Sequence, residues 1–149
     1  MTAQEYLTDR LNDQIAWYDK KSAYNQKRFK SIRILNITLS VSIPFLTTLM
    51  KDGSSNEYLK ILIGFIGASI AVLEAVLNLY KYHENWIQYR STAESLKHHK
   101  YLFETQTGIY ANEKTAFAVL VDNVENLISK EITTWTGNNQ ASKTQQHAS

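Results

Sequence analysis

The sequence predicts an all-α protein: a two-transmembrane helical hairpin whose helices extend into a cytoplasmic stalk, with a third amphipathic helix packed on the stalk. Two observations predict this class. Two long apolar segments lie close together around a short polar loop, and the 149 residues include only five glycines and one proline. An all-β sandwich would need many more turn residues. The length indicates one domain, expected at 1–135, and we expect a disordered polar tail at 136–149.

The two apolar segments have the length and composition of membrane spans. The first, at 34–50, has seventeen residues without a charge, and the second, at 61–80, has twenty residues with Glu74 as its single charge. A helix that crosses a bilayer needs about 17–25 mostly apolar residues. The second segment holds eleven Leu, Ile, Val or Phe residues. Their insertion energy of roughly −3 to −7 kcal/mol outweighs about 3 kcal/mol for a central carboxylate. The competing interpretation is a soluble bundle with two buried helices, which the mean hydropathy of −0.33 would suit.

The basic residues predict the orientation of the hairpin. Six of the sixteen Lys and Arg residues fall between 20 and 33, immediately before the first apolar segment, whereas the loop at 51–60 holds two. The positive-inside rule therefore places both termini in the cytoplasm. The N-terminus lacks the apolar stretch of a secretory signal peptide. We expect a multi-pass protein with the lipid bilayer as its first partner.

The segments outside the predicted spans also have helical periodicity, at about 2–33, 81–106 and 111–135. Because glycine and proline are absent from 68 to 107, we expect one continuous helix from Leu59 to Gln106, with Gly108 as its C-cap. Apolar residues mark the face that each cytoplasmic helix should bury. These residues are Tyr6, Leu7, Leu11, Ile15 and Tyr18; Tyr82, Trp86, Tyr89, Ala93 and Leu96; and Phe117, Leu120, Val121, Val124, Leu127, Ile128 and Trp135.

The sequence contains no recognisable motif for catalysis or for a cofactor. The four histidines lack the spacing of a zinc site, and glycine-rich phosphate loops and nucleophile elbows are missing. The absence of cysteine excludes disulfides and thiolate metal sites. We therefore expect no enzyme activity, no metal and no cofactor. A net charge of only +2 argues against a nucleic-acid partner.

Glu74 points most directly to a function, because a carboxylate inside a membrane span is costly. The hairpin register places it level with Ile37, between Asn36 and Ser40. Two interpretations stay open. Glu74 either bonds Asn36 or Ser40 as polar glue within the hairpin, or lines an aqueous path for cations between several chains. The candidates for lining or gating such a pore share its face or form the polar stripe of the first span: Gly67, Ala71, Asn78, Asn36, Ser40 and Thr47.

Small residues on an adjoining face of the second span, with the proline of the first, are candidates for helix packing: Gly64, Ala68, Ala75 and Pro44. Small residues at this spacing allow helices to approach closely, either within one chain or between chains.

A second cluster lies on the predicted stalk and comprises Trp17, Lys20, Lys21, Trp86, Tyr89, Arg90 and Glu94. The hairpin register brings 19–21 close to Arg90 and Glu94. We expect ion pairs there that hold the two helices together.

Several short stretches match a known family when they are taken together. They are 17–21 (WYDKK), the basic run before the first span, Pro44, Glu74, 86–90 (WIQYR), 94–97 (ESLK), Tyr101, 108–110 (GIY) and Trp135. Over roughly 4–135 the chain resembles the bacterial SLATT group of two-transmembrane effectors associated with nucleotide-signalling proteins. Within that group it is similar to a small stand-alone family of unknown function. The resemblance implies a pore-forming effector of bacterial defence in the inner membrane. This sequence contains no sensor domain, so the trigger would be a separate sensor protein or a signalling ligand.

We therefore expect a homo-oligomeric pore or ion channel, because two helices alone cannot enclose a channel. The alternative is a membrane-anchored interaction or scaffold module without a pore, in which the cytoplasmic helices recruit a partner.

Overall fold

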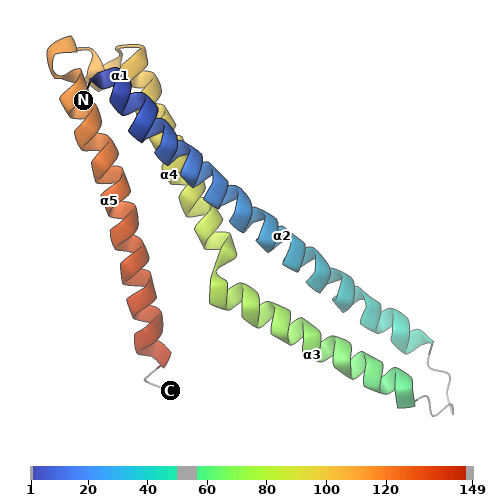
Figure 1. Cartoon of the computed structure of the whole chain (residues 1–149). Helices are drawn as coiled ribbons and strands as arrows, with labels where there is room; N and C mark the ends of the chain where they lie inside the picture. The colour runs from blue at the N-terminus through green and yellow to red at the C-terminus, as the bar shows by residue number, and fades with distance from the viewer. Residues whose placement is uncertain (1, 50–56, 147–149) are drawn as a thin grey trace. The chain divides into compact units, whose positions relative to one another are not determined.

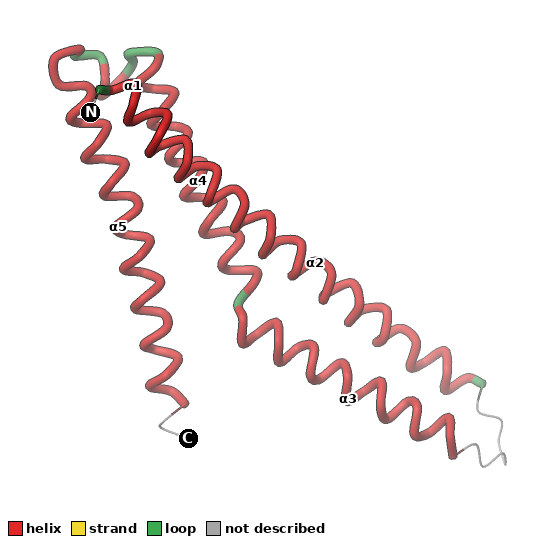
Figure 2. Tube along the Cα trace, viewed as in Figure 1, coloured by secondary structure: helices red, strands yellow, loops and turns green. Residues whose placement is uncertain are grey.

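A computed structural model of the chain describes residues 2–49 and 57–146. Figure 1 shows the helices in order along the chain. They are α1 (Ala3–Glu5), the π-helical η1 (Tyr6–Leu11), α2 (Asn12–Thr48), α3 (Glu57–Tyr80), α4 (Tyr82–Glu104), the 3₁₀ turn η2 (Gly108–Tyr110) and α5 (Glu113–Gln146). Figure 2 contains no strand within the described ranges, so the predicted all-α class is confirmed.

The first long helix begins at a capping box. The Thr2 hydroxyl accepts a hydrogen bond from the Glu5 backbone N–H at 3.3 Å, and the Glu5 carboxylate accepts one from the Thr2 N–H at 2.7 Å. These bonds satisfy donors that the first helical turn leaves free. From Ala3 to Thr48 the chain is then helical over 46 residues. Pro44 lies inside the last turns of α2 without ending the helix.

The expected continuous helix from Leu59 to Gln106 is wrong, because the chain breaks at Lys81 between α3 and α4. Lys81 has a φ of 47°, in the left-handed region that residues other than glycine seldom adopt. The Asn85 side-chain amide donates to the Tyr80 carbonyl at 3.1 Å, which gives this carbonyl a partner at the break. A side-chain hydrogen bond of this kind leaves no glycine or proline signal in a sequence.

The end of α4 also differs from the expected glycine cap. Gln106, with a φ of 52°, takes the left-handed position two residues before Gly108. The Gln106 N–H donates to the Phe103 carbonyl and the Thr107 N–H to the Leu102 carbonyl, at 3.1 and 3.0 Å. This bond pair is a Schellman motif, which satisfies the last carbonyls of the helix. Gly108 instead opens η2.

The last helix is longer than predicted. α5 continues to Gln146, where the sequence predicts a disordered tail from 136. The segment contains no proline, and extending an existing helix adds one hydrogen bond for each residue fixed. Trp135 was predicted to lie in the core, but its side chain is outside the described part of the structure. Residues 147–149 are outside it entirely.

The chain divides into two compact units, and the first combines 1–21 with 88–149. The predicted apolar faces form most of its core, with Tyr110 and Ala116 as additions, and the third amphipathic helix packs on the other two as expected. Tyr82 and Trp86, which were predicted for the same face as Tyr89, belong to the second unit. The buried residues are Tyr6, Leu7, Leu11, Tyr18, Ala93, Leu96, Tyr110, Ala116, Leu120, Val124 and Ile128. Ile15, Tyr89, Leu102, Phe103, Phe117, Val121 and Leu127 pack against them.

The second unit, 22–87, is an antiparallel hairpin of α2 and α3 followed by the start of α4. Phe29 contacts His83, with ring centroids 4.8 Å apart, within one residue of the expected register. In each long helix only 6% of the most apolar window is buried. Both helices are long and apolar enough to cross a membrane, and they are not core helices of this chain. The exposed large side chains include Ile34, Ile37, Val41, Phe45, Ile61, Phe65, Val72 and Leu79.

Candidate functional site

Glu74 of α3 meets two residues of α2 that are three positions apart. The Asn36 side-chain amide donates to Oε2 of Glu74 at 2.8 Å, so the predicted hydrogen bond between them is present. Nη1 of Arg33 donates to the same oxygen at 3.1 Å and forms an ion pair. Residues three apart on a helix share a face, so one helical turn of α2 presents both donors. Sequence reasoning missed Arg33 as a partner, because it counted this residue only among the basic charges outside the span.

The cluster of Arg33, Asn36 and Glu74 is buried on one side and open on the other. Asn36 is 6% exposed, and its Oδ1 atom is buried without a hydrogen-bond partner. The side chains of Arg33 and Glu74 are 50% and 46% exposed. A buried acceptor without a partner costs about 1–3 kcal/mol, so the Oδ1 atom of Asn36 destabilises the hairpin. On its buried side the Glu74 carboxylate is held by Asn36, and on the other side about half of the charged pair faces outward.

The other polar candidates of the first span bond to their own helix. The Ser40 hydroxyl donates to the Asn36 carbonyl at 2.8 Å, and the Thr47 hydroxyl donates to the Pro44 carbonyl at 2.8 Å. Both hydroxyls therefore donate to carbonyls of α2 itself. Of the three α2 residues predicted to form the polar stripe, Asn36 is the one that bonds to Glu74.

The small residues of α3 face outward. A Cβ atom added at Gly64 or Gly67 would meet nothing within 4 Å. Ala68, Ala71 and Ala75 are exposed, as is Asn78 on the face of Glu74. Close approach of α2 to α3 therefore does not explain the two glycines. Beside them runs an apolar groove of about 510 Å³, lined by Leu35, Leu39, Phe65, Ala68, Ser69, Val72 and Leu73.

In the first unit, Asp19 lies at the centre of the predicted ion pairs. Its carboxylate is 3.5 Å from Nη1 of Arg90 and 2.8 Å from Nζ of Lys97. Glu94 pairs with the same two cations, at 2.8 Å from Arg90 and 3.2 Å from Lys97. The four side chains form an alternating network between α2 and α4. Asp19 with Arg90 was expected, and Lys97 is the added member.

The aromatic part of the stalk cluster is divided between the two units. Within the first unit the rings of Trp17 and Tyr89 meet edge to face, with centroids 5.9 Å apart, and Lys21 lies 5.5 Å from the Trp17 ring. Lys20 is exposed. Trp86 belongs to the second unit, where its carbonyl accepts a hydrogen bond from the Ser22 hydroxyl at 3.1 Å. The other six residues of the predicted cluster belong to the first unit.

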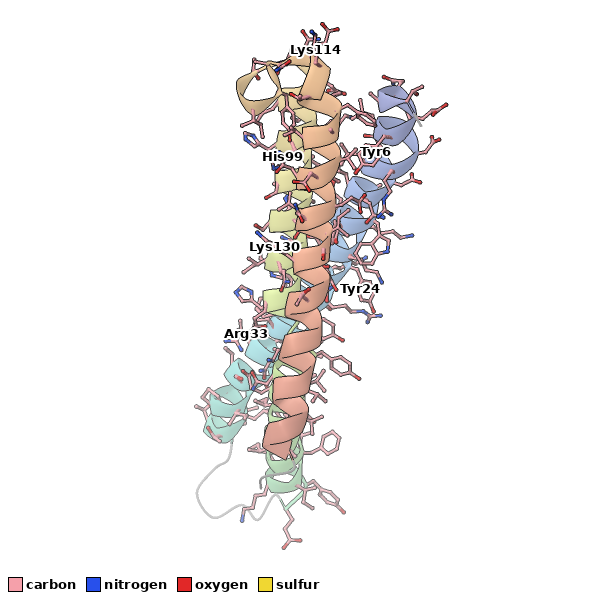
Figure 3. All side chains as sticks on the ribbon, turned by 90° about the vertical axis from the view of Figure 1, so that its left-hand side faces the viewer. Tyr6, Tyr24, Arg33, His99, Lys114 and Lys130 are labelled. Carbon is pink, nitrogen blue, oxygen red and sulfur yellow. The ribbon has the colours of Figure 1, made fainter. Side chains whose placement is uncertain are left out.

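Two carboxylates of α5 hold the N-terminal helices, and sequence reasoning missed both. Figure 3 shows Tyr6 directed toward α5, where its hydroxyl donates to Glu125 at 3.0 Å. Arg10 binds both oxygens of Glu125, at 3.1 and 3.0 Å, and these hydrogen bonds lower the pKa of this carboxyl. The Tyr18 hydroxyl donates to Glu131 at 3.2 Å, while burial raises the pKa of Glu131. These bonds join positions more than a hundred residues apart, which no local pattern reveals.

No group of three or more His, Asp or Glu side chains that could hold a metal ion occurs within 2–49 and 57–146.

Comparison with known proteins gives one match. Residues 13–118 match a family described as "Protein of unknown function (DUF4231)". The matched range includes α3, α4 and all but the first residue of α2, with Asn36 and Glu74. No curated protein and no solved structure matches the chain.

Proposed function

The chain belongs to the DUF4231 family, and we propose that it is an oligomeric membrane protein whose hairpins assemble around a path for ions. The observation that carries the proposal is the half-open pair of Arg33 and Glu74 on an otherwise apolar hairpin. The proposal has three steps: the hairpin enters a bilayer, copies associate through α3, and the open side of the charged pair faces the assembly.

Insertion into a bilayer is supported by the surface of the second unit. Large apolar side chains cover both helices, with Ile34, Val41, Phe45, Ile61 and Phe65 each more than 60% exposed. In water this surface would favour aggregation, whereas lipid tails would cover it. Tyr80 and Tyr82 stack with centroids 5.4 Å apart at the end of α3. Tyrosine is enriched at the bilayer interface, so this pair suits the cytoplasmic boundary.

Association between copies is supported by the small residues and by the charged pair. A Cβ atom at Gly64 or Gly67 would meet no described atom within 4 Å, so another helix could approach their backbone closely. An ion pair half open to hydrocarbon would be costly, which favours a position against protein or water. Each pair of Arg33 and Glu74 is neutral as a whole, so a preference for cations requires the Glu74 carboxylates to lie nearer the axis than the Arg33 side chains. Ala71 and Asn78 share the face of Glu74.

The remaining parts of the proposal concern location and role. Basic residues before α2 enters the apolar region support cytoplasmic termini and a bacterial inner-membrane location. The resemblance to SLATT effectors supports a non-enzymatic role in defence, triggered by a separate sensor protein or a signalling ligand.

An anchored scaffold without a pore is the second candidate. The observation that favours it is the independent core of the first unit, which α5 completes. If the helices at 1–21 and 88–149 kept the biological activity when joined to an unrelated hairpin, the scaffold would replace the pore.

The direct test is ion flux through the purified protein in liposomes. Wild-type protein should pass cations, and Glu74→Gln should reduce the preference for cations over anions severalfold, because the charge facing the path is lost. Glu84→Gln is the matched control, since it makes the same chemical change outside the apolar helices. A wild-type chain that is monomeric in native mass spectrometry and gives no flux would contradict the proposal.

A further inference from the structure

A small basic pocket lies on α2, one turn before the apolar segment begins. Its lining residues are Tyr24, Lys27, Arg28 and Ser31, and its volume is about 360 Å³. They follow one another at helical spacing and therefore share a face of α2. Figure 3 shows Tyr24 projecting from the helix, and this side chain is 54% exposed.

The side chains of the pocket present positive charges and hydrogen-bond donors that could bind an anion. The Arg28 guanidinium lies over the Tyr24 ring, 5.4 Å from the centroid. Such stacking fixes the plane of the guanidinium while leaving its N–H donors free. Lys27 adds a second positive charge, and Ser31 adds a hydroxyl donor. Together they offer the donor set that phosphate oxygens prefer.

The positive charge of the pocket has no ion-pair partner among residues 2–49 and 57–146. Among the described residues, none of the ion pairs includes Lys27, Arg28 or the nearby Lys30. The described carboxylates of the second unit are Glu57, Glu74 and Glu84, and Glu74 is already paired with Arg33. We therefore expect an anion from outside the chain to bind Lys27 and Arg28.

The same face of α2 continues into the apolar groove. Leu35 and Leu39 lie four and eight positions after Ser31, and both line the groove of about 510 Å³, together with Phe65 and other residues of α3. Ser31 is three residues before Ile34, so it lies about 5 Å from the start of the apolar segment. A basic pocket followed along one helix face by an apolar groove matches a phospholipid, whose anionic phosphate would meet the pocket and whose acyl chain would meet the groove.

We propose that this face binds an anionic phospholipid, with its phosphate between Lys27, Arg28 and Ser31 and an acyl chain along Leu35 and Leu39. The inference rests on the proposed insertion of the hairpin into a membrane. Basic clusters beside a membrane helix attract anionic lipids through the surface potential. The stacked Arg28 and the adjoining groove make this a defined site on one helix face.

The test is lipid retention by the full chain after reconstitution in vesicles of phosphatidylglycerol and phosphatidylcholine. Native mass spectrometry should find phosphatidylglycerol bound preferentially to wild type. Lys27→Gln and Arg28→Gln should each reduce its retention about tenfold, because each removes a charge-assisted hydrogen bond to the lipid phosphate. Tyr24→Leu, which keeps the charge, should also weaken retention because it removes the ring under Arg28.

Lys30→Gln is the matched control, because it removes an equal charge from the same turn without lining the pocket. An equal loss for Lys30→Gln would show diffuse attraction and overturn the site. Glycerophosphoglycerol, the headgroup without acyl chains, should not displace the lipid at similar concentration. If it or inorganic phosphate does so, the ligand is a soluble phosphate.

Extraction at alkaline pH checks insertion separately. A protein that stays in the membrane without retaining phosphatidylglycerol overturns the lipid site and leaves the proposed function standing.

Discussion

At the scale of single residues, one of the two partners of the Glu74 carboxylate could be predicted from the hairpin register and the other could not. The register of the hairpin predicted Asn36 or Ser40 as its partner, since antiparallel helices of equal rise bring paired positions to one depth, and Asn36 forms the bond. It did not predict Arg33, whose backbone lies before the apolar segment. A long arginine side chain can extend along a helix to a charge one turn away, and sequence position alone does not give its direction.

Leu120 should carry a large share of the stability of the first unit. It is fully buried in a core shared by α5, α4 and the N-terminal helices. Leu120→Ala should lower the free energy of unfolding by about 2–5 kcal/mol, because it leaves a cavity. Urea unfolding in detergent, followed by far-UV circular dichroism, measures the change. Ile109→Ala, at a 57% exposed site, is the control and should stay within about 0.5 kcal/mol of wild type. Equal effects of the two variants would contradict the assigned core.

His99 should make the first unit less stable in acid. Asn123 donates to the buried Tyr110 hydroxyl at 3.2 Å, and Nδ1 of His99 lies 2.7 Å from the same hydroxyl. We expect Tyr110 to donate its proton to Nδ1 of His99. That bond requires a neutral imidazole. Burial, with a smaller effect of His98, lowers the pKa of His99 from its usual 6.5.

The pKa shift of His99 sets the sign of this effect. As pH falls through 6.5, the histidine of the unfolded chain takes up a proton before His99 of the folded chain does. The contribution of His99 to the free energy of unfolding is therefore fully present above this pH and decreases as the pH falls further. Urea midpoints at several pH values between 5 and 8 test the slope. His99→Gln should flatten it, because glutamine can accept the Tyr110 proton without titrating. A slope unchanged by His99→Gln would assign the acid sensitivity to other groups.

At the scale of elements, the ends of the helices were the least predictable part. Lys81 and Gln106 hold left-handed conformations where neither glycine nor asparagine marks the break. Hydrogen bonds decide both places: the Asn85 amide at the first, and the Schellman pair at the second. The helical faces were predictable, because burial repeats along an element and therefore leaves a periodic signal.

Gln106→Gly should stabilise the protein. A left-handed conformation costs a residue with a Cβ about 1–2 kcal/mol, and glycine avoids most of that cost. We expect a gain of about 1 kcal/mol in the free energy of unfolding, measured as a higher urea midpoint. Gln106→Ala keeps the Cβ and should give no such gain. A loss of stability in Gln106→Gly would show that the glutamine side chain itself stabilises the end of α4.

At the scale of the whole molecule, membrane topology is the first question, and the lack of cysteine makes it accessible. Lys60→Cys lies near the start of α3, and Lys114→Cys lies at the start of α5. Because basic residues stay on the cytoplasmic side, a membrane-impermeant maleimide should label position 60 on intact spheroplasts and position 114 only after lysis. The reverse pattern would invert the orientation. Labelling of both on intact cells would contradict two spans.

The sequence by itself determined the helical class, the two apolar helices, their register and the apolar faces of the cytoplasmic helices. These properties repeat along the chain, so composition and periodicity contain them. Tertiary structure alone decided that Arg33 joins Glu74, that Lys97 joins Asp19, and that Glu125 and Glu131 hold Arg10 and Tyr18. It also decided that Gly64 and Gly67 face away from the chain that contains them. Each of these results depends on which side chains meet after folding, and a polar contact between distant segments leaves no period in the sequence.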